Sequence, residues 1–339
     1  MRRLRFALFA LLTALAGCVV HAAPVTPGID GPIRIEARAV PLDTADVEME
    51  TAGRLRFRGG VELRSRDPRF GGLSALYVTP DGTSITSITD KGHWITGALH
   101  YDQEGRLDGV GDARIGALRG PNGRAVTGTP LHDSESVTRV PGGFAVGFEG
   151  IHRVWLYPDA VPPFSAPPRK LPDPPGIAAA PSNLGLEALS SLPDGRLVAI
   201  TEGLRVGPEA LRGWIADRAG GPWKPFLWTR TGRFAPSDAT ALPDGDLLVL
   251  ERRFTFIGGF AARLSRVKAA ALRPGTTVTG EELAVLAPPL QLDNFEGVAA
   301  RKGPHGETLI YLVSDDNFQP LEKTLLFMLE LLPPAVAKH

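Results

Sequence analysis

The sequence repeats one pattern five times: a small residue or a carboxylate, a tight turn rich in proline and glycine, a short apolar run, and then another acid. In four of these segments the turn begins with a proline, at positions 80, 141, 193 and 243, and a looser fifth turn lies around residues 303–306. Consecutive turns are therefore 50 to 61 residues apart. This spacing is near the length of a propeller blade of four short strands and predicts one unit repeated around an axis.

Each turn is expected to join two short antiparallel strands. Proline at the second position of a turn and glycine at its end fix the backbone angles of a hairpin. Two further strand-like stretches, residues 54–63 and 325–329, are expected to pair and close the ring as a sixth blade. The sequence thus predicts an all-β fold, a single β-propeller with six blades of four antiparallel strands, with five or seven blades as the alternatives. The apolar runs that follow the turns are residues 85–88, 144–148, 197–200, 247–250 and 309–313.

Length and composition agree with one repeat domain. The 339 residues include 39 glycines and 31 prolines, which suits many short strands joined by tight turns. We predict the propeller over residues 54–332, after a proline-rich, acidic lead-in over residues 24–53. The best helical candidate is Pro208–Arg218, which would place its large apolar residues on one helix face.

Residues 1–23 are typical of an export signal. Three arginines precede an apolar stretch at residues 6–16, which is too short to span a bilayer. The run Leu-Ala-Gly-Cys that ends at Cys18 resembles a lipobox, whose cysteine is lipidated after cleavage, and ordinary cleavage near residues 20–23 is the alternative. We therefore expect a protein of the periplasm, or one held at the outer membrane by a lipid anchor. Cys18 is the only cysteine, so no disulfide can form within the chain.

Charge and motifs exclude several classes of function. Removing the leader takes away three of the 37 basic residues and none of the 37 acidic ones, which leaves a nearly neutral surface. Such a surface has no basic excess to neutralise the phosphates of nucleic acid. The sequence also has no serine-hydrolase elbow, zinc-protease motif or nucleotide-binding loop. We expect a monomer that acts on a small molecule.

Acids recur at equivalent places in the repeats. The first strand of every propeller blade lines the central channel, so equivalent residues converge on one axis. One set of acids lies five or six residues before the turn, and a second set lies at the end of the strand after it. The expected metal-binding residues are Glu135, Glu149, Glu187, Glu202, Asp238, Asn294, Glu296 and Asp315.

Acids packed in this way repel one another unless a cation neutralises them. A site of oxygen ligands, with no cysteine or histidine at ligand spacing, favours Ca²⁺ or Mg²⁺ over Zn²⁺. The alternative for each acid is that it caps a turn or pairs with an arginine within a sheet.

Basic side chains lie beside several of these acids. Cations next to metal-binding carboxylates suit a small anionic ester substrate, and simple pairing with the neighbouring acids is the alternative. The candidate substrate-binding residues are Lys91, His93, Arg153, Arg252 and Arg253. The candidate catalytic residues are Asp90, Lys91, Glu187, Glu251 and Arg252.

Six short strings, spread over all five repeats, carry a resemblance to a known family. They are Gly72–Leu76, Thr89–Trp94, Phe148–Gly150, Asn183–Glu187, Leu250–Arg253 and Asn294–Gly297. Together they resemble the bacterial phytase-like family, whose members are described by an esterase-like activity of phytase. The family takes its name from a distant similarity to β-propeller phytases, which are exported, Ca²⁺-dependent phosphomonoesterases. The resemblance implies that acids here hold Ca²⁺, that Lys91, Arg153 and Arg252 bind phosphate, and that a metal-bound water attacks phosphorus.

Two other classes stay open. A lactonase or carboxylesterase of the gluconolactonase type also holds a channel Ca²⁺ with carboxylate and amide oxygens. A propeller without catalytic activity that binds a ligand or partner is the third class, because one fold hosts many functions.

Overall fold

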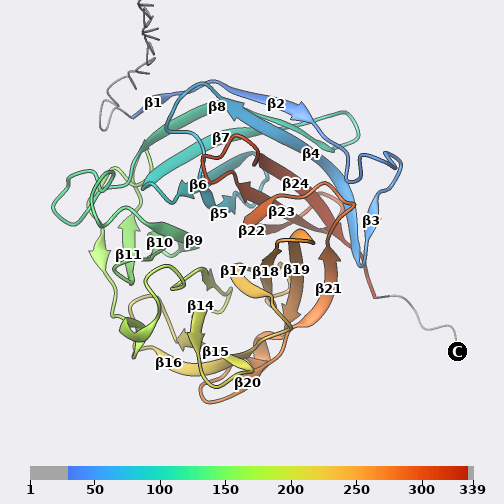
Figure 1. Ribbon diagram of the computed structural model, residues 1–339. Helices are drawn as coiled ribbons and strands as arrows, with labels where there is room; N and C mark the ends of the chain where they lie inside the picture. The colour runs from blue at the N-terminus through green and yellow to red at the C-terminus, as the bar shows by residue number, and fades with distance from the viewer. Residues whose placement is uncertain (1–29, 335–339) are drawn as a thin grey trace, which may run out of the picture.

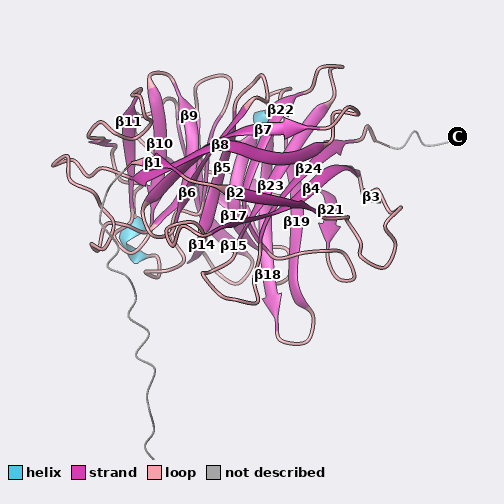
Figure 2. Ribbon diagram, turned by 90° about the horizontal axis from the view of Figure 1, so that it is seen from above, coloured by secondary structure: helices cyan, strands magenta, loops and turns pink. Residues whose placement is uncertain are grey.

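The computed structural model describes residues 30–334, so the predicted export signal and lipobox lie outside the described residues. Five β-sheets are arranged around a central axis, as Figure 1 shows in a view down that axis. Each sheet forms one blade, and its strands follow one another from the axis outward. Figure 2, turned by 90° from that view, shows that the regular structure consists almost entirely of strands, joined by loops.

In the first four blades the three inner strands follow one another in the sequence as antiparallel hairpins, and blades 1 and 3 each gain a short fifth strand at the outer edge. Blade 1 contains β5 (Leu73–Val78), β6 (Ser84–Thr89), β7 (His93–Tyr101), β8 (Leu107–Ala117) and β1 (Gly31–Pro32). Blade 2 contains β9 (Ser134–Val140), β10 (Gly143–Phe148), β11 (Arg153–Pro158) and β12 (Arg169–Lys170). Blade 3 contains β13 (Ala188–Ser191), β14 (Leu197–Arg205), β15 (Ala210–Ala216), β16 (Lys224–Thr229) and β20 (Thr277–Val278). Blade 4 contains β17 (Ala235–Ala241), β18 (Leu247–Thr255), β19 (Gly259–Val267) and β21 (Glu281–Leu286).

The fifth blade joins the two ends of the described chain. Its strands are β22 (Asn294–Lys302), β23 (Thr308–Asp315), β24 (Thr324–Leu331), β4 (Leu55–Ser65), β2 (Ile35–Ala39) and the short β3 (Thr51–Ala52). The antiparallel pairing of β24 with β4 confirms that the two leftover strands share a sheet. The predicted sixth blade was wrong, because the fifth repeat has only three strands of its own and β4 supplies its fourth. Within the predicted lead-in, β1 extends blade 1 and β2 extends blade 5. This segment therefore bridges the first and the last blade of the ring.

The ring is held together by apolar layers between neighbouring blades. There are five such layers of buried side chains, one for each pair of adjacent blades, including the pair that closes the circle. The inner strands β5, β9, β13, β17 and β22 each contact the next one around the axis. Every blade is therefore buried on both faces, and the edges that face the axis meet in a closed circle.

The expected helix at Pro208–Arg218 is instead strand β15. Leu211 and Ile215 pack into the layer toward blade 4, whereas Trp214 packs into the layer toward blade 2. A half-exposed strand alternates apolar and polar residues, but a strand buried on both faces does not. The large apolar residues of β15 therefore resembled the pattern of a helix. The described helices are two single 3₁₀ turns, η1 (Ile177–Ala179) and η2 (Ala269–Ala271). Among residues 30–334, no helix has the length and apolar character needed to cross a membrane.

Candidate functional site

A β-bulge marks the same point on the inner strands of four blades. At this point the pairing with the second strand shifts and leaves one inner residue without a partner. A bulge of this kind redirects the side chain that it carries. In blade 3, Glu187 stands directly before the first paired residue, Ala188, and so occupies the matching position. The five equivalent residues, which we call the inner ring, are Ser74, Glu135, Glu187, Ser237 and Glu296.

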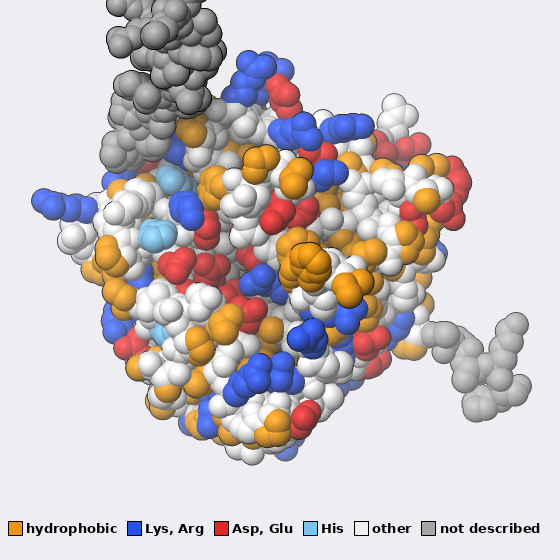
Figure 3. Space-filling model, in the orientation of Figure 1, with side chains coloured by type: hydrophobic (Ala, Val, Ile, Leu, Met, Phe, Trp, Pro, Cys, Tyr) orange, Lys and Arg blue, Asp and Glu red, His pale blue; other side chains and the backbone are white. Residues whose placement is uncertain are grey.

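The same register defines a second set of equivalent residues at the mouth of the channel, at the end of each second strand. Four of its members are acids, and the fifth, in blade 4, is an arginine. We call this set the mouth ring: Asp90, Glu149, Glu202, Arg252 and Asp315. The two rings together place carboxylates from separate blades at one end of the channel. Figure 3 shows red side chains gathered in a hollow at the centre of this face, with a blue side chain among them.

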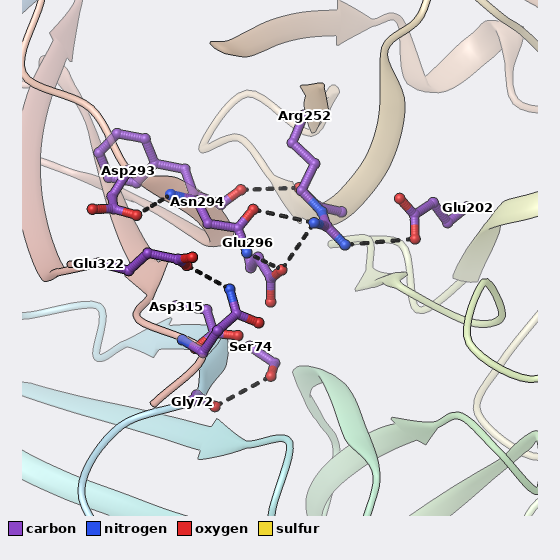
Figure 4. Close-up of polar contacts among 12 residues, drawn as sticks. Gly72, Ser74, Glu202, Arg252, Asp293, Asn294, Glu296, Asp315 and Glu322 are labelled. Carbon is purple, nitrogen blue, oxygen red and sulfur yellow. Dashed lines mark hydrogen bonds and ion pairs between the residues drawn. The ribbon is translucent and has the colours of Figure 1, made fainter. Parts of the chain in front are cut away.

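Arg252 neutralises one side of this acidic cluster. Its Nη1 lies 3.2 Å from Glu296 Oε1 and donates a hydrogen bond of 3.1 Å to Asn294 Oδ1. Its Nη2 lies 3.6 Å from Glu202 Oε2. The amide of Asn294 also donates a hydrogen bond of 2.7 Å to Glu296 Oε1, so these groups form one connected network (Figure 4).

On the opposite side of the cluster, no lysine or arginine of residues 30–334 forms an ion pair with Asp133, Glu135 or Glu149. Carboxylate oxygens of Asp133, Glu135 and Glu149 lie within 4.8 Å of one another. Glu135 is only 7% exposed, and among residues 30–334 no hydrogen bond or ion pair involves its carboxylate. Glu149 is held in place by a hydrogen bond from the backbone N–H of Gly185. A buried carboxylate without a partner carries a large desolvation penalty, which a bound cation would offset.

Burial and mutual repulsion make these acids hard to ionise. Burial, together with the neighbouring charges of Glu296 and Glu149, holds the pKa of Glu135 well above its usual range. Burial raises the pKa of Glu149 to about 7. Burial, with Glu296 nearby, raises the pKa of Asp315 to about 8. Burial and the adjacent Glu149 also raise the pKa of Glu187. At neutral pH this cluster therefore retains protons unless a cation favours the ionised forms.

The donor set suits a hard divalent cation. Asp133, Glu135 and Glu149 offer only oxygen ligands from carboxylates, which Ca²⁺ and Mg²⁺ prefer. The prediction from sequence missed Asp133. Its signal was its place two residues before Glu135, directly ahead of strand β9.

Two predicted metal-binding or catalytic acids of blade 4 lie outside the cluster. Asp238 is fully buried and accepts hydrogen bonds of 2.8 Å from the backbone N–H groups of Ala239 and Val298, so it ties β17 to β22. Glu251 is buried within its blade, where it accepts hydrogen bonds from Trp228 Nε1 at 3.2 Å and from Arg263. Asp238 follows the inner-ring position by one residue, and Glu251 precedes the mouth-ring position by one residue. Ser237 and Arg252 occupy the ring positions instead.

The predicted substrate-binding cations differ in where they lie. Lys91 contacts the cluster, because its Nζ lies 3.0 Å from Asp90 Oδ2 and its side chain remains 53% exposed. Arg153 is buried, stacks on the rings of Phe148 and Trp155, and donates to backbone carbonyls. Its guanidinium is therefore engaged by aromatic rings and by the carbonyls of Ile151 and Leu131.

The two remaining candidates also lie apart from the carboxylates. Arg253 stacks on the ring of Phe234 at 4.9 Å. Burial, and then the charge of Arg69, lowers the pKa of His93 to about 4. Of the predicted substrate-binding residues, Lys91 and Arg252 are those that form ion pairs with acids of the cluster.

Three solved structures with a similar course of the chain are only distantly similar in sequence. A PQQ-bound aldose sugar dehydrogenase from Streptomyces coelicolor is 13% identical, with 88% of this chain and 99% of that chain covered and a TM-score of 0.40. A protein of unknown function from Dyadobacter fermentans is 12% identical, with 81% and 83% covered and a TM-score of 0.42. A chain of an S. cerevisiae assembly of dbp5 with nup159 and gle1 is 9% identical, with 84% and 96% covered and a TM-score of 0.39. Likenesses at these TM-scores carry no activity over to this chain.

The comparison with protein families is more specific. No curated protein matches the chain at a significant level. The family model described as "Phytase-like: Esterase-like activity of phytase" matches residues 68–318, which include every member of both rings and Asp133. This match confirms the family predicted from the sequence motifs. The chain belongs to the phytase-like family.

Proposed function

We propose that the protein is an exported, cation-dependent ester hydrolase that acts on phosphate esters at the channel mouth. The observation that carries the proposal is the group formed by Asp133, Glu135 and Glu149, whose carboxylate oxygens lie within 4.8 Å of one another. Within that group, Glu135 is buried and has neither a hydrogen bond nor an ion pair among the described residues. A divalent cation bound there would supply a Lewis acid for an ester oxygen.

The other residues of the mouth have separate tasks in this proposal. Lys91 is half exposed and can turn from Asp90 toward an oxygen of an anionic substrate. Arg252 is held by Glu202, Asn294 and Glu296, so it keeps the far side of the cluster neutral and directs a positive charge into the channel. Both cations would stabilise negative charge that develops on the ester group.

Proton transfer would fall to acids whose pKa lies near neutrality. Burial raises the pKa of Glu149 to about 7, and burial raises that of Asp315 to about 8. An acid of this kind holds a proton at pH 7 and can give it to a departing alkoxide. Asp315 is the better placed of the two, because Glu149 belongs to the cation-binding group.

Hydrolysis of carboxylic esters is the second candidate, and the positions of the cations favour it. Two of the arginines expected to bind phosphate, Arg153 and Arg253, stack on aromatic rings. The mouth therefore offers fewer cations than a doubly charged phosphate monoester would require. The family description, which names an esterase-like activity, also agrees with this candidate.

One assay separates the candidates. The purified protein is incubated with p-nitrophenyl phosphate and with p-nitrophenyl acetate, each with EDTA, with added Ca²⁺ and with added Mg²⁺. The proposal predicts phosphate release that EDTA abolishes and the cation restores. It also predicts that Glu135→Gln loses this activity whereas Glu48→Gln, a matched change at an exposed position, retains it. Release from the acetate alone would support the second candidate, and turnover of neither ester would leave a binding propeller.

A further inference from the structure

Exposed apolar side chains gather around the same mouth as the acids. Among the described residues, eight large apolar side chains are exposed, and six of them lie where the second strand of blade 2, 4 or 5 turns into the third, with Phe254 in the last residues of β18, next to the turn. In the sequence these connections follow Glu149, Arg252 and Asp315. The six residues are Ile151, Phe254, Phe256, Ile257, Phe318 and Leu321, which we call the apolar rim.

The longest of these loops projects beyond the mouth. Strand β18 continues for three residues past Arg252 and still pairs with β19 at Thr255. At about 3.3 Å per residue, these three residues place the hairpin tip about 10 Å beyond Arg252. Figure 2 shows β18 and its loop extending out of the body of the propeller. At the tip, Phe256 is 97% exposed and Ile257 is 99% exposed.

We infer that the apolar rim docks the channel mouth onto a lipid surface, with Phe256 and Ile257 inserted among the lipids. Side chains that bind a small ligand line a concave pocket that buries the ligand. The side chains of this rim stand instead on three separate connections between strands, and Phe256, Ile257 and Leu321 are each more than 90% exposed. Apolar area of this kind is stabilised when an apolar medium replaces the water around it.

Charge and chain length favour lipid over a protein partner. Lys91 stands half exposed at the mouth, so it can contact an anionic headgroup while the hairpin tip enters the acyl region. The sequence ahead of the structure includes the lipobox-like Cys18, twelve positions before Asp30. Twelve extended residues span at most about 40 Å. A lipid on Cys18 would thus hold the propeller within reach of a bilayer.

Docking in this orientation turns the acidic cluster toward the membrane surface. Together with the proposed hydrolase function, on which this step rests, it assigns the substrate to esters presented at a lipid–water interface. The docking itself needs no catalysis, so its failure and the failure of the hydrolase proposal can be told apart.

The test places a fluorescent probe at the tip of the hairpin in the full chain. In Phe256→Trp a tryptophan replaces a side chain that packs against nothing, and the five native tryptophans are all buried. The matched control is Val161→Trp, because Val161 is 100% exposed and follows β11 at the opposite end of its blade. Each variant is mixed with vesicles of phosphatidylcholine brominated in the acyl chains, with and without phosphatidylglycerol.

The inference predicts that bromolipid quenches the emission of Phe256→Trp and shifts it to the blue, while Val161→Trp stays unchanged. It also predicts that the double variant Phe256→Ser/Ile257→Ser binds vesicles about tenfold more weakly or worse. Equal quenching of the two tryptophan variants would overturn the inference, because a tether alone would then explain the contact. No quenching of Phe256→Trp in either lipid mixture would also overturn it and would leave the rim to a protein partner.

Discussion

Replacing Glu149 with glutamine should stabilise the cation-free protein and weaken its response to a cation. Burial raises the pKa of this carboxyl from 4.5 to about 7. Between these values the folded protein keeps a proton that the unfolded chain releases, so the stability of the wild type falls as pH rises through this range. Glutamine has no charge to bury, and its carbonyl can still accept the hydrogen bond from Gly185.

The size of the effect follows from the two pKa values. A difference of about 2.5 between them, at about 1.4 kcal/mol for each pKa unit, corresponds to about 3 kcal/mol. We expect the variant to match the wild type below pH 4.5, where both side chains are neutral. Above pH 8, in EDTA, it should exceed the wild type by up to about 3 kcal/mol. A cation at one hundred times its dissociation constant adds about 2.7 kcal/mol to the wild type, and the variant should gain far less.

The assay is urea unfolding at pH 4.5 and at pH 8.5, in EDTA and in Ca²⁺, followed by tryptophan fluorescence. Glu48→Gln, an exposed change of the same kind, controls for the loss of one negative charge from the whole protein. The reasoning is refuted if Glu149→Gln unfolds at a lower urea concentration than the wild type in EDTA at pH 8.5. It is also refuted if both proteins gain equally from Ca²⁺.

Three further substitutions test other parts of the account. Arg263→Met leaves Glu251 buried without its ion pair and should destabilise the fold by about 3–5 kcal/mol in urea unfolding, whereas Arg263→Met combined with Glu251→Leu should recover most of that loss. Asp238→Ala removes a hydrogen bond from Ala239 within β17 and another from Val298 of β22, and should cost about 2–4 kcal/mol, with the Ca²⁺ affinity from calorimetry unchanged. Arg252→Gln removes the positive charge that pairs with Glu202 and Glu296. This variant should therefore bind two Ca²⁺ ions in a calorimetric titration where the wild type binds one. An unchanged stoichiometry would show that Arg252 does not limit the site.

The repeat made much of the fold and part of the site predictable. Turn spacing indicated a ring of blades, and it placed Glu135, Glu187 and Glu296 in phase, since each lies at the same bulge or at its equivalent. Counting from the turn failed in blade 4, because the bulge and not the turn decides which residue faces the axis. Asp238 and Glu251 each stand one residue away from the position that does.

Other features depend on packing that the spacing does not express. Blade count was overestimated because β4 completes blade 5, a pairing between residues far apart in the sequence. Arg153 stands beside Glu149 in the sequence, yet the aromatic rings of Phe148 and Trp155 hold its guanidinium in the blade. Asp133 joins the cluster through the direction of its side chain, which no repeat count reveals.

The most direct test of the central claim is diffraction from crystals soaked in Ca²⁺ or in a lanthanide with a strong anomalous signal. The account predicts an ion bound by Asp133, Glu135 and Glu149, at about 2.3–2.6 Å from their oxygens for Ca²⁺. A saturated crystal in which Glu135 binds no ion would contradict the claim that the converging acids form a cation site.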